Sequence, residues 1–299
     1  MSKLSDKIIK SIKDKSKNLE AEMSFFDHLE ELRWHLVRSA LAIVVFSILA
    51  FVYYDFIFDH VIMAPSKVDF WTYRMMCNVG HFLESNVAWP HFKASDFCID
   101  KINVKLINTE LAGQFNLQIN SSLLIGLVAG IPYLLFELWR FIRPALHEKE
   151  RKAASGFVFY ASSLFIIGVL FGYFVITPLS IRFLAGYTVS NTIDNLFSID
   201  SYISSVGTLT IGTGVVFQMP ILVYILANIG ILTPKFMRST RRYAIVVILI
   251  IAAIVTPTPD ALTMTVVAIP LLLLYELSIS VAALVERRRK KRNDELTIS

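Results

Sequence analysis

Residues 35–56 read HLVRSALAIVVFSILAFVYYDF, and no charged side chain interrupts this stretch between Arg38 and Asp55. A helix of about 20 apolar residues is long enough to cross the roughly 30 Å hydrocarbon core of a bilayer. Five further apolar segments follow, at about 117–141, 154–177, 202–230, 243–256 and 261–285. The sequence therefore predicts an all-α membrane protein with six transmembrane helices.

Composition supports this class and argues against a globular enzyme. Only 18% of the 299 residues are charged and 55% are hydrophobic, whereas soluble domains carry about 25% charged residues. Residues 1–22 are rich in lysine and have no apolar core, so we expect no cleavable signal peptide. We expect a basic N-terminal segment at 1–22, a membrane domain at 23–285 and a basic tail at 286–299.

The basic residues predict the orientation in the membrane. They gather in the first 22 residues, near 142–153 and 231–242, and in the tail sequence ERRRKKR. The other side holds Lys67, Arg74, Lys93, Lys101, Lys105 and Arg182. Because cytoplasmic loops carry the excess of Lys and Arg, both termini should be cytoplasmic. For the basic tails, contact with anionic lipid is favoured over nucleic-acid binding.

The segment at 55–116 is too long for a simple connector and should fold as a small outer cap. It contains the only two cysteines, Cys77 and Cys98. A structural disulfide is favoured over a metal site, since two thiols do not complete a tetrahedral zinc shell. The stretch KINVKLINTELAGQF, residues 101–115, fits either a strand or an amphipathic helix.

Small residues and prolines mark several of the apolar segments. The second and third contain Gly126-x-x-x-Gly130 and Gly168-x-x-x-Gly172, a weak signal for close helix packing. The fourth contains Pro220 and should kink. The fifth is short, the sixth should end early at Pro270 and Glu276, and such a pair would thin the bilayer locally.

No sequence motif of a known enzyme class is present, and we do not expect catalytic activity. Three polar residues occur at membrane depth, where each requires a partner. Gln218 fits a helix–helix hydrogen bond or a functional contact. Glu276 fits a helix cap or an ion pair, and Glu137 fits a surface pair with Arg140, three residues later on the helix.

Five motifs in chain order resemble the TatC family, the multispanning receptor of the twin-arginine translocase. They are DHLEELRWHL at 27–36, FIRPALHEKE at 141–150, FQMP at 217–220, TPTPD at 256–260 and AIPLLLLYE at 268–276. The resemblance implies a concave, cup-like bundle in the bacterial inner membrane that binds twin-arginine signal peptides of folded precursors. It also implies single-span TatA and TatB partners, coupling to the proton-motive force, a homo-oligomer within a complex, and no cofactor.

The resemblance assigns roles to particular positions of this chain. Glu31 and Glu150 match the acidic positions that bind the signal peptide, and Phe141 and Pro144 match the loop motif beside them. Gln218 matches an intramembrane polar position that contacts partners. Pro65, Pro257 and Asp260 match outer turns, the second turn with one extra residue between its prolines. The long segment at 55–116 is not inherited from the family.

The carboxylates of Glu31 and Glu150 suit paired arginines, because a guanidinium forms bidentate, charge-assisted hydrogen bonds with a carboxylate. An exposed pair contributes only about 0–1 kcal/mol, so useful affinity requires partial burial. Two alternatives remain open. Glu31 fits a carboxylate that stabilises a helix start, and the chain fits a secondary transporter with Gln218 and Glu276 in an ion site.

Overall fold

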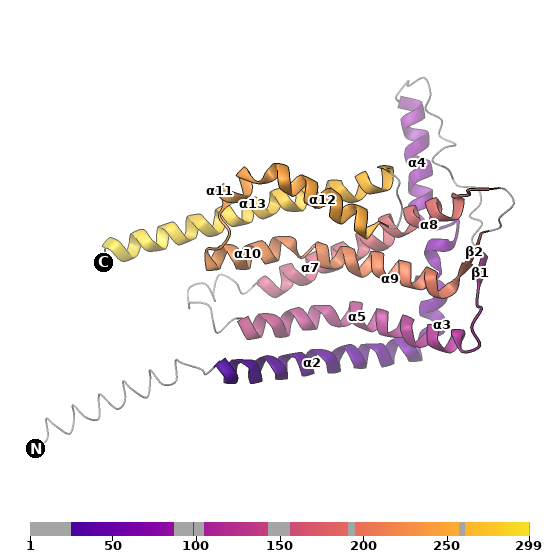
Figure 1. Ribbon diagram of the computed structural model, residues 1–299, viewed down its shortest axis with the longest axis horizontal. Helices are drawn as coiled ribbons and strands as arrows, with labels where there is room; N and C mark the ends of the chain where they lie inside the picture. Colours follow the sequence, from indigo (N-terminus) through magenta and orange to yellow (C-terminus); the bar gives the residue numbers. More distant parts are fainter. Residues whose placement is uncertain are drawn as a thin grey trace, which may run out of the picture.

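A computed structural model describes residues 25–86, 98, 105–142, 156–190, 195–256 and 261–298. Long helices run along one axis, and the start of the first helix and the end of the last lie at the same end (Figure 1). We call this the terminal end of the bundle, and the other the distal end. The elements are α2 Phe25–Val52, α3 Tyr54–Ile57, η1 Phe58–Ile62, η2 Ala64–Ser66, α4 Trp71–Asn86, β1 Lys105–Ile107, α5 Gly113–Ile142, α7 Phe157–Phe171, η5 Gly172–Ile176, α8 Thr177–Gly186, β2 Leu196–Ser198, α9 Ile199–Val216, α10 Met219–Ile229, α11 Pro234–Ser239, α12 Arg241–Val255 and α13 Ala261–Ile298.

Within the described ranges, five helical stretches are long and apolar enough to cross a membrane. They are Glu30–Val52, Gly113–Ile142, Phe157–Gly186, Ile199–Ile229 and Thr263–Arg288. The fifth expected span is α12, whose 15 residues extend only about 22 Å at 1.5 Å per residue. The short fifth helix is therefore confirmed as a structural feature, while a sixth full-length span is not.

The glycines of the second span allow α5 to approach α2 closely. A Cβ atom added to Gly126 would lie 2.6 Å from the backbone nitrogen of Ser47, and one added to Gly130 would lie 3.2 Å from Cα of Ile43. These distances are shorter than van der Waals contact, so larger residues would push the helices apart. The GxxxG spacing thus serves helix packing here.

The same arrangement recurs between the third and fourth spans. A Cβ atom on Gly168 would lie 2.9 Å from Cα of Gly214, and one on Gly172 would lie 3.0 Å from Cα of Thr210. The third span, α7–η5–α8, therefore packs backbone to backbone against α9, and both GxxxG sequences lie at helix interfaces.

The fourth span is interrupted, as its proline predicts. Helix α9 ends at Val216, and α10 begins at Met219 with Pro220 in its first turn. The last span differs from expectation, because α13 continues through Pro270 without a break. The predicted early end at Pro270 and Glu276 is wrong. Neighbouring groups within a membrane bundle can compensate for the hydrogen bond that proline removes.

At the distal end, β1 and β2 form a short parallel pair that places Leu106 opposite Phe197. The stretch 101–115 thus contributes a three-residue strand and then, from Gly113, the start of α5. The stretch therefore contains both predicted structures, a strand at 105–107 and the start of a helix at 113–115. The pairing joins the segment before the second span to the segment before the fourth.

Tyrosine hydroxyl groups from three separate elements bind the turn at residues 61–65 to the rest of the bundle. Each donates a hydrogen bond to a backbone carbonyl oxygen of the turn, and Pro65 itself is buried. Burial, together with the nearby Tyr202, raises the pKa of Tyr73, so its hydroxyl remains a protonated donor. The pairs are Tyr73 with Pro65 at 3.0 Å, Tyr173 with Val61 at 2.6 Å and Tyr202 with Ile62 at 2.9 Å.

In the long segment after the first span, the longest helix among the described residues is α4, which extends away from the bundle (Figure 1). Cys77 on this helix forms a disulfide with Cys98. At the other end of the chain, α13 continues past residue 286 to Ile298. The basic tail expected to begin at 286 is therefore a continuation of the last helix.

Candidate functional site

At the terminal end of the bundle, the structure describes the side chains of three carboxylates on α2 and α5, and these differ in their partners. Glu30 and Glu31 lie in the first two turns of α2, and Glu137 lies in the last two turns of α5. Their environments decide which of them could bind a cationic ligand.

Glu137 is buried between the two helices, with only 2% of its surface exposed. Its carboxylate accepts a hydrogen bond from Nδ1 of His35 at 2.5 Å and another from the Tyr133 hydroxyl at 2.8 Å. The expected surface pair of Glu137 with Arg140 is therefore wrong. Because both carboxylate oxygens are occupied inside the protein, Glu137 joins α2 to α5 and is not open to a ligand.

His35 also positions an aromatic residue of the site. The Phe141 ring stands edge-on to the His35 ring, with 6.1 Å between their centroids. Phe141 follows Glu137 by one helical turn, just before α5 ends at Ile142. The contact between His35 and Glu137 therefore fixes the level of Phe141 relative to α2.

Glu31 lies one turn before His35 on α2 and is half-buried. In the part of the chain that the structure describes, its carboxylate has no hydrogen bond or ion-pair partner. Its neighbour Glu30 is exposed and lies 3.8 Å from Arg33. Glu31 is thus a partly buried carboxylate, one turn before the His35 that contacts Phe141, and it has no described partner that would compete with a cation.

Four of the expected site residues lie outside the described residues: Glu150, Pro144, Pro257 and Asp260. The structure therefore brings Glu31 and Phe141 to one end of the bundle through His35. Pro65 and Gln218 are placed elsewhere, in the distal turn and between α9 and α10.

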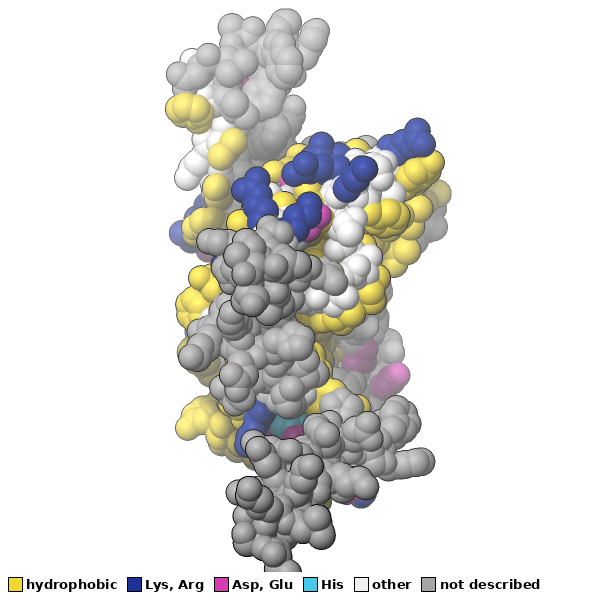
Figure 2. Space-filling view, turned by 90° about the vertical axis from the view of Figure 1, so that its left-hand side faces the viewer, with side chains coloured by type: hydrophobic (Ala, Val, Ile, Leu, Met, Phe, Trp, Pro, Cys, Tyr) yellow, Lys and Arg dark blue, Asp and Glu magenta, His cyan; other side chains and the backbone are white. Residues whose placement is uncertain are grey.

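Basic side chains share the terminal end with these carboxylates. Figure 2 shows Lys and Arg gathered over one part of this face. The described elements that contribute exposed basic residues here are α11, the start of α12 and the end of α13. They are Lys235, Arg238, Arg241, Arg242, Arg287, Arg288 and Lys290.

Gln218, at the break of the fourth span, makes a hydrogen bond between helices. Its Nε2 donates to the backbone carbonyl oxygen of Ala161 on α7 at 3.1 Å. Its Oε1 atom is buried and accepts no hydrogen bond within the described structure. The prediction that Gln218 forms a hydrogen bond between helices is therefore confirmed for its Nε2 atom. Its Oε1 atom is left as an acceptor without a described donor.

Glu276 on α13 forms an ion pair with Arg241 at the start of α12, with 2.7 Å between Oε2 of the glutamate and Nη2 of the arginine. The expectation that Glu276 pairs with a neighbour is therefore confirmed. Gln218 and Glu276 bond to different helices, so each is explained by a local contact between helices. Neither contact requires an ion between the two residues.

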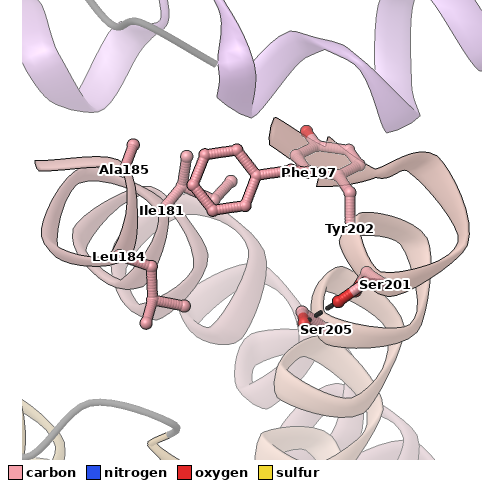
Figure 3. A pocket seen from close by; sticks show the side chains of 7 residues that line it. All are labelled: Ile181, Leu184, Ala185, Phe197, Ser201, Tyr202 and Ser205. Carbon is pink, nitrogen blue, oxygen red and sulfur yellow. Dashed lines mark hydrogen bonds between the residues drawn. The ribbon is translucent and has the colours of Figure 1, made fainter. Parts of the chain in front are cut away.

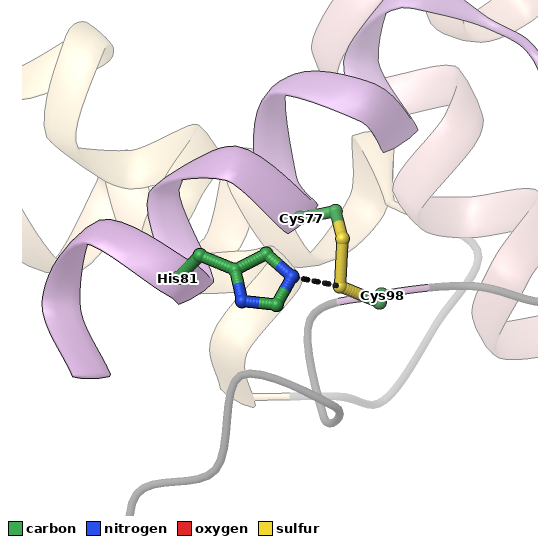
Figure 4. Close-up of side chains that lie close together, drawn as sticks. All are labelled: Cys77, His81 and Cys98. Carbon is green, nitrogen blue, oxygen red and sulfur yellow. Dashed lines mark hydrogen bonds between the residues drawn. A yellow bond between two sulfur atoms is a disulfide. The ribbon is translucent and has the colours of Figure 1, made fainter. Parts of the chain in front are cut away.

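At the distal end, Cys77, His81 and Cys98 bring three potential metal ligands within 4.8 Å of one another (Figure 4). The two sulfur atoms are bonded to each other. Because a metal binds thiolates, a disulfide offers neither sulfur as a strong ligand. The geometry therefore favours a covalent link between Cys98 and α4 over a metal site.

The distal end also has a pocket of about 70 Å³ between α8 and α9 (Figure 3). Its walls include Ile181, Leu184, Phe197 and Tyr202. Ser205 also lines it, but its hydroxyl donates to the carbonyl oxygen of Ser201 on its own helix. Among the residues that the structure describes, no set of polar groups converges on this pocket, so it is not a candidate for binding a polar ligand.

Comparison with known proteins relates this geometry to one family. The family model described as Sec-independent protein translocase protein (TatC) matches residues 27–270. The TatC protein of Blattabacterium sp. subsp. Periplaneta americana is 34% identical over 91% of this chain and 100% of its own length. That of Koribacter versatilis is 36% identical over 90% of this chain and 89% of its own length.

Structural comparison agrees with the sequence comparison. A crystal structure of the twin-arginine translocase receptor TatC matches with a TM-score of 0.62 and 33% identity, over 87% of this chain and 99% of that one. The TatC protein of Aquifex aeolicus is also 33% identical, over 90% of this chain and 98% of its own length.

Proposed function

Because the chain belongs to the TatC family of Sec-independent protein translocase proteins, we propose that it is the receptor for twin-arginine signal peptides of folded precursors. In this proposal the terminal end faces the cytoplasm, and the protein crosses the bacterial inner membrane six times. The half-buried Glu31, without a described partner among its neighbours, carries the proposal.

The three carboxylates differ in their burial and in whether their oxygens already have partners. Glu137 is buried and occupied, and Glu30 is exposed to water, where an added ion pair gains little. Glu31 is partly shielded, so a guanidinium that replaces its water forms a stronger, charge-assisted hydrogen bond. We propose that one arginine of the signal binds Glu31 and the other binds Glu150.

Apolar contacts complete the proposed site. Phe141 lies one residue before the end of α5, beside His35, and Pro144 follows it in the sequence. These two residues would contact the apolar part of the signal peptide that follows its arginines. The ion pairs would then select arginine, and burial of apolar surface would add to the affinity.

Partner recruitment is a second part of the proposal. The unused Oε1 of Gln218 is a buried acceptor at the break between α9 and α10. We propose that the break opens when a TatA- or TatB-type helix or the inserted signal packs against it, and that Oε1 then accepts a hydrogen bond from that helix. The short α12 would thin the bilayer nearby and favour such a helix at this edge.

Substitution of Glu31 tests the receptor function, with its neighbour as control. Glu31→Gln should abolish copurification and export of a twin-arginine precursor, because the amide keeps the shape and loses the charge. Glu30→Gln changes the same functional group one residue away and should leave both nearly unchanged. If Glu31→Gln binds and exports the precursor like the unsubstituted protein, the proposal is wrong.

A further inference from the structure

Helix α4, Trp71–Asn86, runs across the long axis of the bundle at the distal end (Figure 1). The membrane-crossing helices run along this axis, so they define the direction of the membrane normal. A helix perpendicular to them lies parallel to the membrane plane. Its 16 residues extend about 24 Å in that plane.

Contacts at the start of α4 set its depth. The Thr72 hydroxyl donates to the carbonyl oxygen of Phe174, and the ring of Phe70 stacks on that of Phe174 at 5.5 Å. Phe174 lies inside the stretch Phe157–Gly186 that is long enough to cross the membrane. It is roughly 26 Å along the helix from Phe157, close to the far boundary of a hydrocarbon core about 30 Å thick.

One face of α4 is apolar and exposed. Trp71, Met75, Val79 and Phe82 follow one another at intervals of three or four residues, so they share a face. Their exposed fractions are 58%, 50%, 42% and 66%. Trp71 continues this stripe onto the bundle, because its ring meets that of Phe174 edge-on at 6.0 Å.

The opposite side of α4 is polar and is tethered. Cys77 and His81 lie on it one turn apart, and both contact Cys98, through the disulfide and at 3.7 Å between Nε2 and Sγ (Figure 4). Glu84 lies on the same side. The covalent link therefore joins the polar face, and the apolar stripe points away from it.

We propose that α4 lies in the membrane interface at the distal end, with its apolar stripe among the lipid acyl chains of that leaflet. Its direction and depth are those of an interfacial amphipathic helix, and tryptophan is favoured at such boundaries. The stripe is continuous with the bundle surface at Trp71 and Phe174. The lipid contact is mainly apolar, because Arg74 is paired with Asp69 at 3.4 Å.

The short α12 fits this placement. In Figure 1, α4 extends from the bundle in the direction in which α12 and α13 lie relative to α2 and α5. A helix of 15 residues draws the membrane boundary inward around it. On that side the interface comes closer to the level at which α4 contacts Phe174 of the third span.

Nitroxide accessibility in proteoliposomes tests this inference. A spin label is attached to cysteine at one of three positions: Val79→Cys on the stripe, Glu84→Cys as the matched polar control on α4, and Leu49→Cys as an exposed reference on α2. Labelling without reductant keeps the disulfide. Collision rates are measured with oxygen, which concentrates in lipid, and with a water-soluble nickel chelate.

The label at 79 should resemble that at 49, with an oxygen-to-nickel ratio several-fold higher than at 84. A ratio at 79 equal to that at 84 would overturn the proposal, since the stripe would then face water. Low collision rates with both reagents at 79 would also overturn it, because protein would then cover the stripe. A Met75→Asp variant should raise nickel access at 79, and access that does not change would contradict the proposal.

Discussion

Among single residues, the carboxylates at the terminal end illustrate how a local partner decides a role. Glu31 and Glu137 carry the same group at the same end of two packed helices, yet only Glu137 has a histidine and a tyrosine within hydrogen-bond distance. In the membrane domain a buried carboxylate requires such partners. Glu137 therefore joins α2 to α5, and we propose that Glu31 binds the ligand.

The link between His35 and Glu137 should be measurable as a coupling between the two residues. Either single variant, His35→Ala or Glu137→Ala, leaves its partner buried without its main contact. The double variant should be less destabilised than the sum, with a coupling free energy of about 1–2 kcal/mol. Unfolding in mixed micelles measures it, and additive effects would show that the two side chains do not support each other.

The sequence predicted part of this chemistry and misplaced the rest. Spacing alone offered Arg140 as a partner for Glu137, because residues three apart on a helix are neighbours. The actual partner, His35, is 102 positions away in the sequence. A histidine one turn after Glu31 was visible, but only the packing of α2 on α5 shows which group it faces.

Among the elements, the close helix pairs depend on glycine. At Gly126 a Cβ atom would meet the backbone of Ser47, which cannot move without shifting α2. At Gly212 on α9, a Cβ atom would meet nothing within 4 Å. The two glycines thus occupy similar helices and differ in what surrounds them.

Substituting these glycines should give opposite results. Gly126→Leu should lower the free energy of unfolding by about 1–3 kcal/mol through overpacking, and it should separate α2 from α5. Gly212→Ala serves as the control and should be neutral or slightly stabilising. Thermal unfolding in detergent gives the comparison, and equal effects at both positions would refute the close packing of α2 and α5.

Hydrophobic length predicted the elements well where packing did not intervene. The long apolar runs became helices, and Pro220 marks the break between α9 and α10. Pro270 was misleading, because Leu271 and Leu274 beside it on α13 are buried in the core, and α13 packs against both α10 and α12. Whether a proline breaks a membrane helix depends on such contacts, which the sequence does not display.

At the scale of the whole molecule, charge and chain direction agree. The start of α2 and the end of α13 lie at one end (Figure 1), and exposed basic residues gather there. The cytoplasmic side of membrane proteins carries this excess. We therefore propose that the terminal end is cytoplasmic and that α4 lies at the outer surface.

Labelling of intact cells tests this orientation. A cysteine at Lys67, at the distal end, should react with a maleimide that cannot cross membranes. A cysteine at Arg288, near the end of α13, should react only after the cells are opened. Reaction of the cysteine at 288 in intact cells would show that the orientation is reversed.

The central claim is that Glu31 recognises the paired arginines of a signal peptide. Its most direct test places a photo-crosslinking residue at position 30, which leaves Glu31 in place, and adds a twin-arginine precursor, or the same precursor with two lysines, to the membranes. The account predicts a strong adduct with the arginine precursor and little with the lysine one, because only guanidinium forms the bidentate hydrogen bond. Equal adducts with both precursors would contradict it.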